Sequence, residues 1–164
     1  MADPRHPESD VRSRSYCIAS AETRCRHCGR SSGVVALLVP EDHESLDAEI
    51  TGELNAWQTA GANAFLFYVV DLPEGVQRRL LLLCPAFRWA HSEATLNSYW
   101  ANHCAHCGSL LGDHDLHCEP GGAFMPQSEA EAAWIRLLQI DEPLAAAAAG
   151  YAPEPEFFRF MRRV

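Results

Sequence analysis

The sequence predicts an α+β fold with a small antiparallel sheet, an inserted helix and a C-terminal helix. Two segments, 34–40 and 63–71, are dense in β-branched and aromatic residues, which is typical of buried strands. Another segment begins at Pro73 and repeats apolar residues at helical spacing until Pro85 ends it. A short cysteine motif that occurs twice then indicates how distant parts of the chain are held together.

The length and composition of the chain suit one folded domain. It has 164 residues, of which 48% are hydrophobic. A chain of this size buries roughly two thirds of its unfolded surface. Residues 1–14 are rich in Pro, Arg, Ser and Asp, so we expect a disordered tail there. Residues 15–164 are then expected to form a single α+β domain.

The elements before the second cysteine motif are predicted to be strands and one helix. Residues 41–53 are acidic and contain Gly52, so we expect a loop with a short helical piece. The helix after Pro73 carries its apolar residues on one side, namely Val76, Leu80, Leu83 and Cys84. Short strands are expected at 87–89 and 97–100, on either side of a polar turn.

The C-terminal part of the chain is predicted to be mainly helical. Residues 112–122 contain too many turn residues for a helix. Ser128 and Glu131 then form a capping-box pattern, which opens an amphipathic helix. The apolar side of that helix consists of Ala130, Ala133, Trp134, Leu137 and Leu138. One or two helical turns are expected over 143–149, and the apolar, basic segment 156–164 is expected to close the core.

The cysteine motif reads Cys25-Arg-His-Cys28-Gly29 in its first copy and Cys104-Ala-His-Cys107-Gly108 in its second. We call each copy a knuckle. The final glycine can adopt a positive φ, which lets backbone amides turn toward the sulfur atoms. Zinc prefers four sulfur or nitrogen ligands in a tetrahedron, so two converging knuckles complete one closed site. The sequence therefore predicts a structural zinc site with the ligands Cys25, Cys28, Cys104 and Cys107.

A long stretch of chain lies between the knuckles, because 75 residues (29 to 103) separate Cys28 from Cys104. A shared zinc ion would join the N-terminal segment to the middle of the chain, and its binding energy would stabilise the fold. Zinc ribbons carry each knuckle at the tip of a β-hairpin, so we expect a strand beside each one. Three alternatives stay open: a separate metal at each knuckle, with His114, His117 or Cys118 assisting the second; a redox-active pair; and simply buried cysteines.

The segment 113–119 is the best candidate for chemistry other than a structural metal site. Its polar side chains could bind a catalytic metal or transfer protons; they are Asp113, His114, Asp115, His117 and Glu119. Their spacing matches no helix-based metal motif, so a solvated polar loop is the favoured interpretation. A metal-dependent hydrolase is the third hypothesis for function, and we assign no catalytic residues.

The charge of the chain bears on its partners. A formal net charge of −9 argues against binding of double-stranded nucleic acid, which needs many cationic side chains. Basic residues gather around the first knuckle and near the C-terminus, namely Arg24, Arg26, Arg30, Arg159, Arg162 and Arg163. The four tryptophans are expected to pack in the core or at the metal site rather than to form a stacking platform. We therefore favour a non-enzymatic protein-interaction module, with a nucleic-acid-binding protein as the second hypothesis.

The sequence also favours a cytoplasmic location. No apolar segment reaches the ~20 residues that a membrane-spanning helix needs, so we expect no membrane association. The N-terminal residues lack the apolar core of a secretion signal. Seven cysteines, four of them in knuckles, fit a reducing compartment better than a disulfide framework.

The two motifs resemble those of uncharacterised bacterial proteins with paired zinc knuckles. The first motif is Thr23-Arg-Cys-Arg-His-Cys-Gly, followed by an apolar strand. The second is Ser98-Tyr-Trp-Ala-Asn-His-Cys-Ala-His-Cys-Gly, which leads into Gly112-Asp and Glu119-Pro-Gly-Gly-Ala-Phe. The resemblance covers about residues 20–126. It implies a zinc-ribbon-like site at the four knuckle cysteines, and it implies no particular activity.

Overall fold

The computed structural model describes residues 9–46, 57–152 and 155–164, with the side chains of 149–152 and 155–156 left out. Part of the predicted tail 1–14 and of the predicted loop 41–53 therefore lies outside the described residues. Within them the fold is mostly β, with a twelve-stranded mixed sheet and three short helices. The sequence-based α+β prediction was therefore wrong in its balance, because it expected too much helix and too small a sheet.

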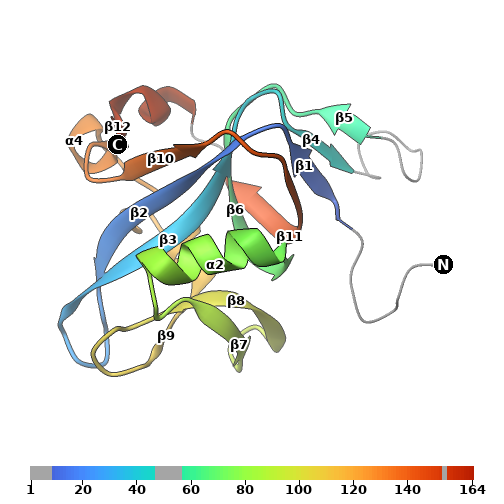
Figure 1. Cartoon of the computed structure of the whole chain (residues 1–164). Coiled ribbons are helices and arrows are strands. Elements are labelled where there is room, and N and C mark those ends of the chain that lie inside the picture. Colours follow the sequence, from blue (N-terminus) through green and yellow to red (C-terminus); the bar gives the residue numbers. More distant parts are fainter. Residues whose placement is uncertain (1–8, 47–56, 153–154) are drawn as a thin grey trace.

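The elements follow one another from blue to red in Figure 1. The strands are β1 (Val11–Ser13), β2 (Tyr16–Arg24), β3 (Ser31–Val39), β4 (Glu44–Leu46), β5 (Trp57–Thr59), β6 (Ala64–Asp71), β7 (Arg88–Ser92), β8 (Asn97–His103), β9 (Leu110–Leu111), β10 (Arg136–Ile140), β11 (Leu144–Ala152) and β12 (Arg162–Arg163). The helices are α2 (Glu74–Leu83), α3 (Asp113–His117), α4 (Glu129–Ala132) and the 3-10 helix η1 (Pro155–Phe160).

The main run of paired strands is β12-β10-β2-β3-β6-β11-β1-β4-β5. Strand β8 also pairs with β6, and it carries β7 and β9 as its own neighbours. All pairs are antiparallel except β10–β12, which is parallel. Strand β6 therefore links the long run of strands to the β7-β8-β9 unit that carries the second knuckle.

Two hydrophobic clusters cover the opposite faces of the central strands. Successive side chains of a strand point to opposite faces, so β2, β3 and β6 contribute to both clusters. The first cluster lies under α2 and contains Ile18, Leu37, Leu66, Val76 and Leu80. The second contains the two buried knuckle cysteines together with Ala19, Ala36, Phe65, Phe124, Phe158 and Met161. The candidate metal site thus belongs to the face opposite α2.

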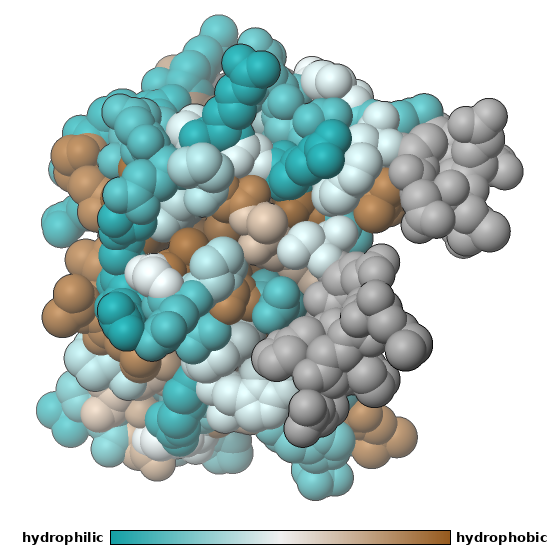
Figure 2. Space-filling view, turned by 45° about the vertical axis from the view of Figure 1, so that its right-hand side comes forward, coloured by the Kyte–Doolittle hydropathy of each residue, from teal (hydrophilic) through white to brown (hydrophobic). Residues whose placement is uncertain are grey.

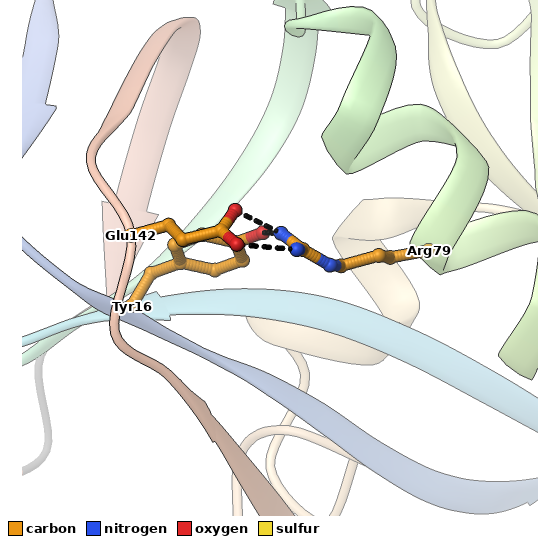
Figure 3. A network of polar contacts seen from close by, with 3 residues as sticks. All are labelled: Tyr16, Arg79 and Glu142. Atoms are coloured by element: carbon orange, nitrogen blue, oxygen red, sulfur yellow. Dashed lines mark hydrogen bonds and ion pairs between the residues drawn. The ribbon is translucent and has the colours of Figure 1, made fainter.

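Helix α2 is fixed to the sheet by one polar network, which Figure 3 shows from close by. The guanidinium of Arg79 donates two hydrogen bonds to the carboxylate of Glu142, at 2.6 and 2.7 Å. It donates a third to the hydroxyl of Tyr16, at 3.1 Å. Glu142 lies between β10 and β11, and Tyr16 begins β2, so one side chain joins the helix to three strands.

Several predicted elements are confirmed. Residues 34–40 and 63–71 match β3 and β6, and the helix after Pro73 matches α2. Residues 87–89 and 97–100 correspond to β7 and β8. The C-terminal segment closes the core as expected, because Phe158 and Met161 are buried in the second cluster. On α2, however, Leu83 is 51% exposed instead of buried.

The helix predicted from residue 128 onward was wrong beyond its first turn. Its start is confirmed, since the Ser128 hydroxyl accepts a hydrogen bond from the Glu131 amide at 3.1 Å. Helix α4 then ends at Ala132, and β10 follows as a partner of β2. Leu137 is buried in the second cluster and Leu138 packs against the first, which is the two-residue alternation of a strand. Pairing with β2 therefore overrides the local helical pattern.

Four other predictions also differ from the structure. Of the helical turns predicted over 143–149, residues 144–149 belong to strand β11 instead. This strand pairs with both β6 and β1, so two sheet neighbours override the helix propensity of the alanines. Residues 113–117 form helix α3 within a segment that was expected to contain none. Part of the predicted tail 1–14 forms β1, where Val11 is buried in the first cluster. Part of the predicted loop 41–53 forms β4.

Figure 2 turns the molecule by 45°, so that the side on which Figure 1 places β1, β4 and β5 comes forward. Hydrophobic residues gather in the middle of this face, and hydrophilic residues surround them. Apolar side chains are therefore visible between the hydrophilic ones on this side of the molecule.

Gly122 lies at a position where the surrounding backbone leaves no room for a side chain. A Cβ atom at this position would lie 2.3 Å from the carbonyl oxygen of Asp115 and 2.8 Å from that of Leu116. We expect Gly122→Ala to lower the free energy of unfolding by about 2 kcal/mol or more, because backbone atoms must shift. Urea unfolding measures this change. The control is Gly75→Ala in α2, which has open space around it and should change stability by less than about 1 kcal/mol.

Candidate metal centre

Each knuckle forms the tip of a hairpin. The first connects β2 to β3, and the second connects β8 to β9. The two have matching backbone hydrogen bonds: Gly29 N–H to Cys25 O and Gly108 N–H to Cys104 O, each at 2.9 Å. The two glycines have φ values of 72° and 76°, the left-handed conformation that favours glycine. The same local geometry is thus built twice, at places far apart in the sequence.

The four knuckle sulfur atoms converge. The Sγ atoms of Cys25 and Cys107 are 3.5 Å apart, and those of Cys28 and Cys104 are 3.7 Å apart. All four lie within 4.8 Å of one another. Four sulfurs around one zinc ion at about 2.3 Å would be about 3.8 Å apart, so the cluster is consistent with a bound metal ion. It joins segments 76 positions apart, as the sequence predicted.

The alternative with two separate metals is not supported by this arrangement. His114, His117 and Cys118 were the predicted helpers of the second knuckle, and none of them belongs to the four-cysteine cluster. Cys25 and Cys104 are buried, whereas Cys28 and Cys107 are exposed. An ion in the cluster would therefore have two ligands on the protein side and two on the solvent side.

The surroundings of the cysteines favour thiolate at some positions and thiol at others. The hydrogen bond with the Ser109 hydroxyl, at 3.2 Å, is the main reason that the pKa of Cys107 falls to about 6. The pKa of Cys104 is also lowered, chiefly by the backbone amides of Cys107 and His106. The Arg30 amide lowers the pKa of Cys28, but burial and the neighbouring sulfurs raise it to about 11. Without a cation, Cys28, Cys104 and Cys107 therefore do not ionise together.

Polar contacts between the hairpins hold the knuckles side by side. The Ser32 hydroxyl accepts a hydrogen bond from the Ala105 amide at 3.0 Å. The ring Nε2 of His106 donates to the Ser31 carbonyl, also at 3.0 Å. These contacts pair the start of β3 with the second knuckle.

Asn102 is a positioning residue that the sequence did not indicate. Its side-chain oxygen accepts a hydrogen bond from the Val35 amide, and its side-chain nitrogen donates to the Val35 carbonyl, both at 2.9 Å. The buried amide group thus pairs with β3 as a strand backbone would. Asn102 lies two residues before Cys104, so this pairing fixes the second knuckle relative to β3. A polar residue in a buried strand beside a knuckle was the signal available in the sequence.

The residues of segment 113–119 do not form one centre. Asp113 and His117 are buried, with exposed fractions of 4% and 1%. His114, Asp115 and Glu119 are exposed and lie within 4.8 Å of one another. The carboxylate of Asp115 is 3.7 Å from the guanidinium of Arg26. The polar set proposed for a hydrolase is therefore divided between the core and the surface.

Asp113 is buried as a hydrogen-bond acceptor for the backbone. Its Oδ2 accepts a hydrogen bond of 2.7 Å from the amide of Tyr68, which has a φ of 51°. The Asp113 amide donates to the Tyr99 hydroxyl at 3.3 Å. Burial raises the pKa of the Asp113 carboxyl to about 7, although the Tyr68 amide opposes this shift.

His117 lies in an aromatic sandwich. Its ring stacks on Phe67 and Phe124, with centroid distances of 5.0 and 5.1 Å, and meets Phe65 edge-on at 5.9 Å. Its Nδ1 has no hydrogen-bond partner in the described part of the chain. Burial lowers the pKa of this imidazole to about 3, so the ring is neutral at ordinary pH. Such a ring packs as an apolar group.

These two buried groups make opposite contributions to the pH dependence of stability. Asp113 has an ordinary pKa of 3.8 and a folded-state pKa of about 7, so its contribution decreases as pH rises between those values. His117 has an ordinary pKa of 6.5 and a folded-state pKa of about 3, so its contribution is lost as pH falls through that window. The two slopes offset each other between about pH 4 and 6.5.

When one of the two groups is substituted, we expect the free energy of unfolding to show the pH dependence that the other group contributes. Relative to the native chain, Asp113→Asn should gain stability as pH rises from 5 to 7, by about 1 kcal/mol per pH unit. His117→Phe should gain stability as pH falls from 6.5 to 5. Urea unfolding at several pH values measures both. Asp115→Asn, at an exposed position, is the control, and an equal slope in that variant would contradict the assignment.

The comparisons with known proteins add no relatives, since no family model, curated protein or solved structure matches this chain. None of the described helices is long and apolar enough to cross a membrane. The resemblance to bacterial proteins with paired zinc knuckles therefore rests on the two motifs alone. What the chain itself displays is a four-cysteine cluster consistent with a metal ion, which joins two distant hairpins.

Proposed function

We propose that this chain is a non-enzymatic protein-interaction module built around one structural zinc ion. The ligands are Cys25, Cys28, Cys104 and Cys107, and the arrangement is zinc-ribbon-like because each pair lies at the tip of a hairpin. The observation that carries the proposal is the mutual approach of all four sulfur atoms within 4.8 Å. Thiolate ligands in this number and spacing suit Zn²⁺ better than cations that prefer oxygen ligands.

The ion has a structural role in this proposal because four protein ligands leave no open coordination position for a substrate. The polar set at 113–119 is divided between core and surface, which supports a protein without its own catalytic centre. A reducing compartment such as the cytoplasm keeps the four thiols available for the metal.

A protein partner is favoured by the apolar groups on the surface of α2 and the hairpin that follows it. Large hydrophobic side chains are exposed there: Leu81 by 41%, Leu82 by 84%, Leu83 by 51%, Trp89 by 48% and Leu96 by 73%. Clustered exposed apolar side chains are typical of protein-binding surfaces. Around the first knuckle, in contrast, Arg26 already faces Asp115, which weakens that site as a contact for nucleic acid.

The zinc proposal is tested by native mass spectrometry combined with thermal unfolding. We expect one zinc ion per chain, and removal by a chelator should lower the unfolding midpoint by more than about 10 °C, because binding energy is folding energy. Cys28→Ser and Cys107→Ser should lose the ion. Cys118→Ser is the control and should keep it, since Cys118 is outside the cluster. A chain that is equally stable and metal-free after purification without chelators would refute the proposal.

The partner is tested by a photoreactive amino acid placed at Leu82 in cells. We expect adducts with protein from this position, because Leu82 is the most exposed of the apolar side chains on α2. Arg14, which is exposed on another part of the molecule, is the control position and should give few adducts. Adducts with nucleic acid, or equal yields from both positions, would exclude this surface as the protein-binding one.

A further inference from the structure

Trp134 was expected to pack in the core or at the metal site and is instead one of the most exposed large hydrophobic residues that the structure describes. Helix α4 ends at Ala132, and Trp134 lies in the short connection to β10 with 71% of its surface exposed. Its backbone amide is satisfied by the carbonyl of Glu131 at 3.1 Å. No ring contact of its indole occurs within the described residues. The indole faces are therefore open to a ligand.

Two arginines lie next to each other on the adjoining strands. Arg136 and Arg162 are direct partners in the parallel β10–β12 pair, and both are exposed. Paired residues of neighbouring strands are about 5 Å apart, and like charges there destabilise the sheet. Neither guanidinium has an ion pair within residues 9–46, 57–152 and 155–164. An anion held between them would remove this repulsion.

These three side chains border one depression in the surface. It has a volume of about 630 Å³ and is lined by Trp134, Arg136, Arg162, Ser20, Ala21, Glu22, Gly33 and Ala133. Its floor is formed by small residues of β2 and β3, and a Cβ atom at Gly33 would meet nothing within 4 Å. The volume lies within the range of small-molecule sites. Figure 1 shows α4, β12 and the start of β10 together at one end of the molecule, beside β2.

We propose that this depression binds a nucleotide, with the phosphate on Arg136 and Arg162 and the base stacked on Trp134. Guanidinium groups bind phosphate oxygens in a bidentate manner, which suits a pair of unpaired arginines. An exposed indole is a strong stacking partner for a nucleic-acid base. Glu22 is the one acidic residue in the lining, and its carboxylate can accept a hydrogen bond from an amino group of the base.

Two sources supply the same chemistry, a free nucleotide and a single-stranded nucleic acid. The formal charge of −9 repels a long polyanion over the rest of the surface, whereas one nucleotide meets mainly the two arginines. This inference goes beyond the proposed metal and protein-partner roles and depends on neither. It concerns other residues and is tested on the full-length chain as purified.

The experiment measures binding of fluorescently labelled adenosine monophosphate and of labelled eight-nucleotide single-stranded DNA at low salt. We expect Trp134→Ala, and separately the pair Arg136→Gln with Arg162→Gln, to weaken binding about tenfold or more. Trp134→Phe should retain part of the affinity because a smaller ring still stacks. The control pair, Arg14→Gln with Arg88→Gln, removes the same charge from other exposed positions and should change binding less than about twofold.

The relative affinities identify the source. Binding of the mononucleotide as tight as that of the DNA indicates a free nucleotide, and clearly tighter binding of the DNA indicates a strand. The proposal is overturned if neither probe binds at low salt, or if the control pair weakens binding as much as the Arg136 and Arg162 pair. It is also overturned if a poly-glutamate peptide binds as tightly and Trp134→Ala has no effect, because the site then recognises acidic peptide. Thermal unfolding verifies that each variant is folded.

Discussion

The approach of four cysteine sulfur atoms within 4.8 Å of one another is the constraint on which the structure depends most. Four thiolates at this spacing would repel one another strongly. Either a cation lies among the sulfur atoms, or some of them keep their protons. The sulfurs come from hairpins 76 positions apart in the sequence, so their convergence also sets the course of the chain between them. A divalent cation would replace the repulsion by four bonds and hold both hairpins at once.

The fold prepares this convergence through contacts that involve no sulfur. Asn102 pairs with the backbone of Val35 and places the end of β8 against β3. The Ser32 hydroxyl then receives the amide of Ala105 in the second knuckle. Asn102 and Ala105 each lie within three residues of Cys104. The hydrogen bonds that they form therefore help to align the two hairpin tips. A bound metal ion would add stability to an arrangement that these hydrogen bonds also support.

The sequence predicted the parts of the fold that depend on local patterns. The knuckles, β3, β6 and α2 each carry their signal within about ten residues, in turn glycines, apolar density or helical spacing. The errors concern residues that pair with distant strands. Residues 136–140 have a helical apolar pattern but pair with β2, more than 110 positions away, and the alanine-rich β11 pairs with β1 and β6. Whether such a segment forms a strand depends on its partner strand, and the residues of the segment alone carry no information about that partner.

The same switch from helix to strand produces the surface around Trp134. In a continuous helix from residue 128, Trp134 would lie on the apolar side with Ala130, Leu137 and Leu138. Because α4 ends after one turn, only the strand residues enter the core, and the indole remains outside. Strand β10 then brings Arg136 beside Arg162, which the sequence places 26 positions later. An exposed aromatic ring and two arginines that have no ion pair in the described part of the chain thus lie together because β10 pairs with β2. The proposed binding surface therefore results from the pairing of distant strands.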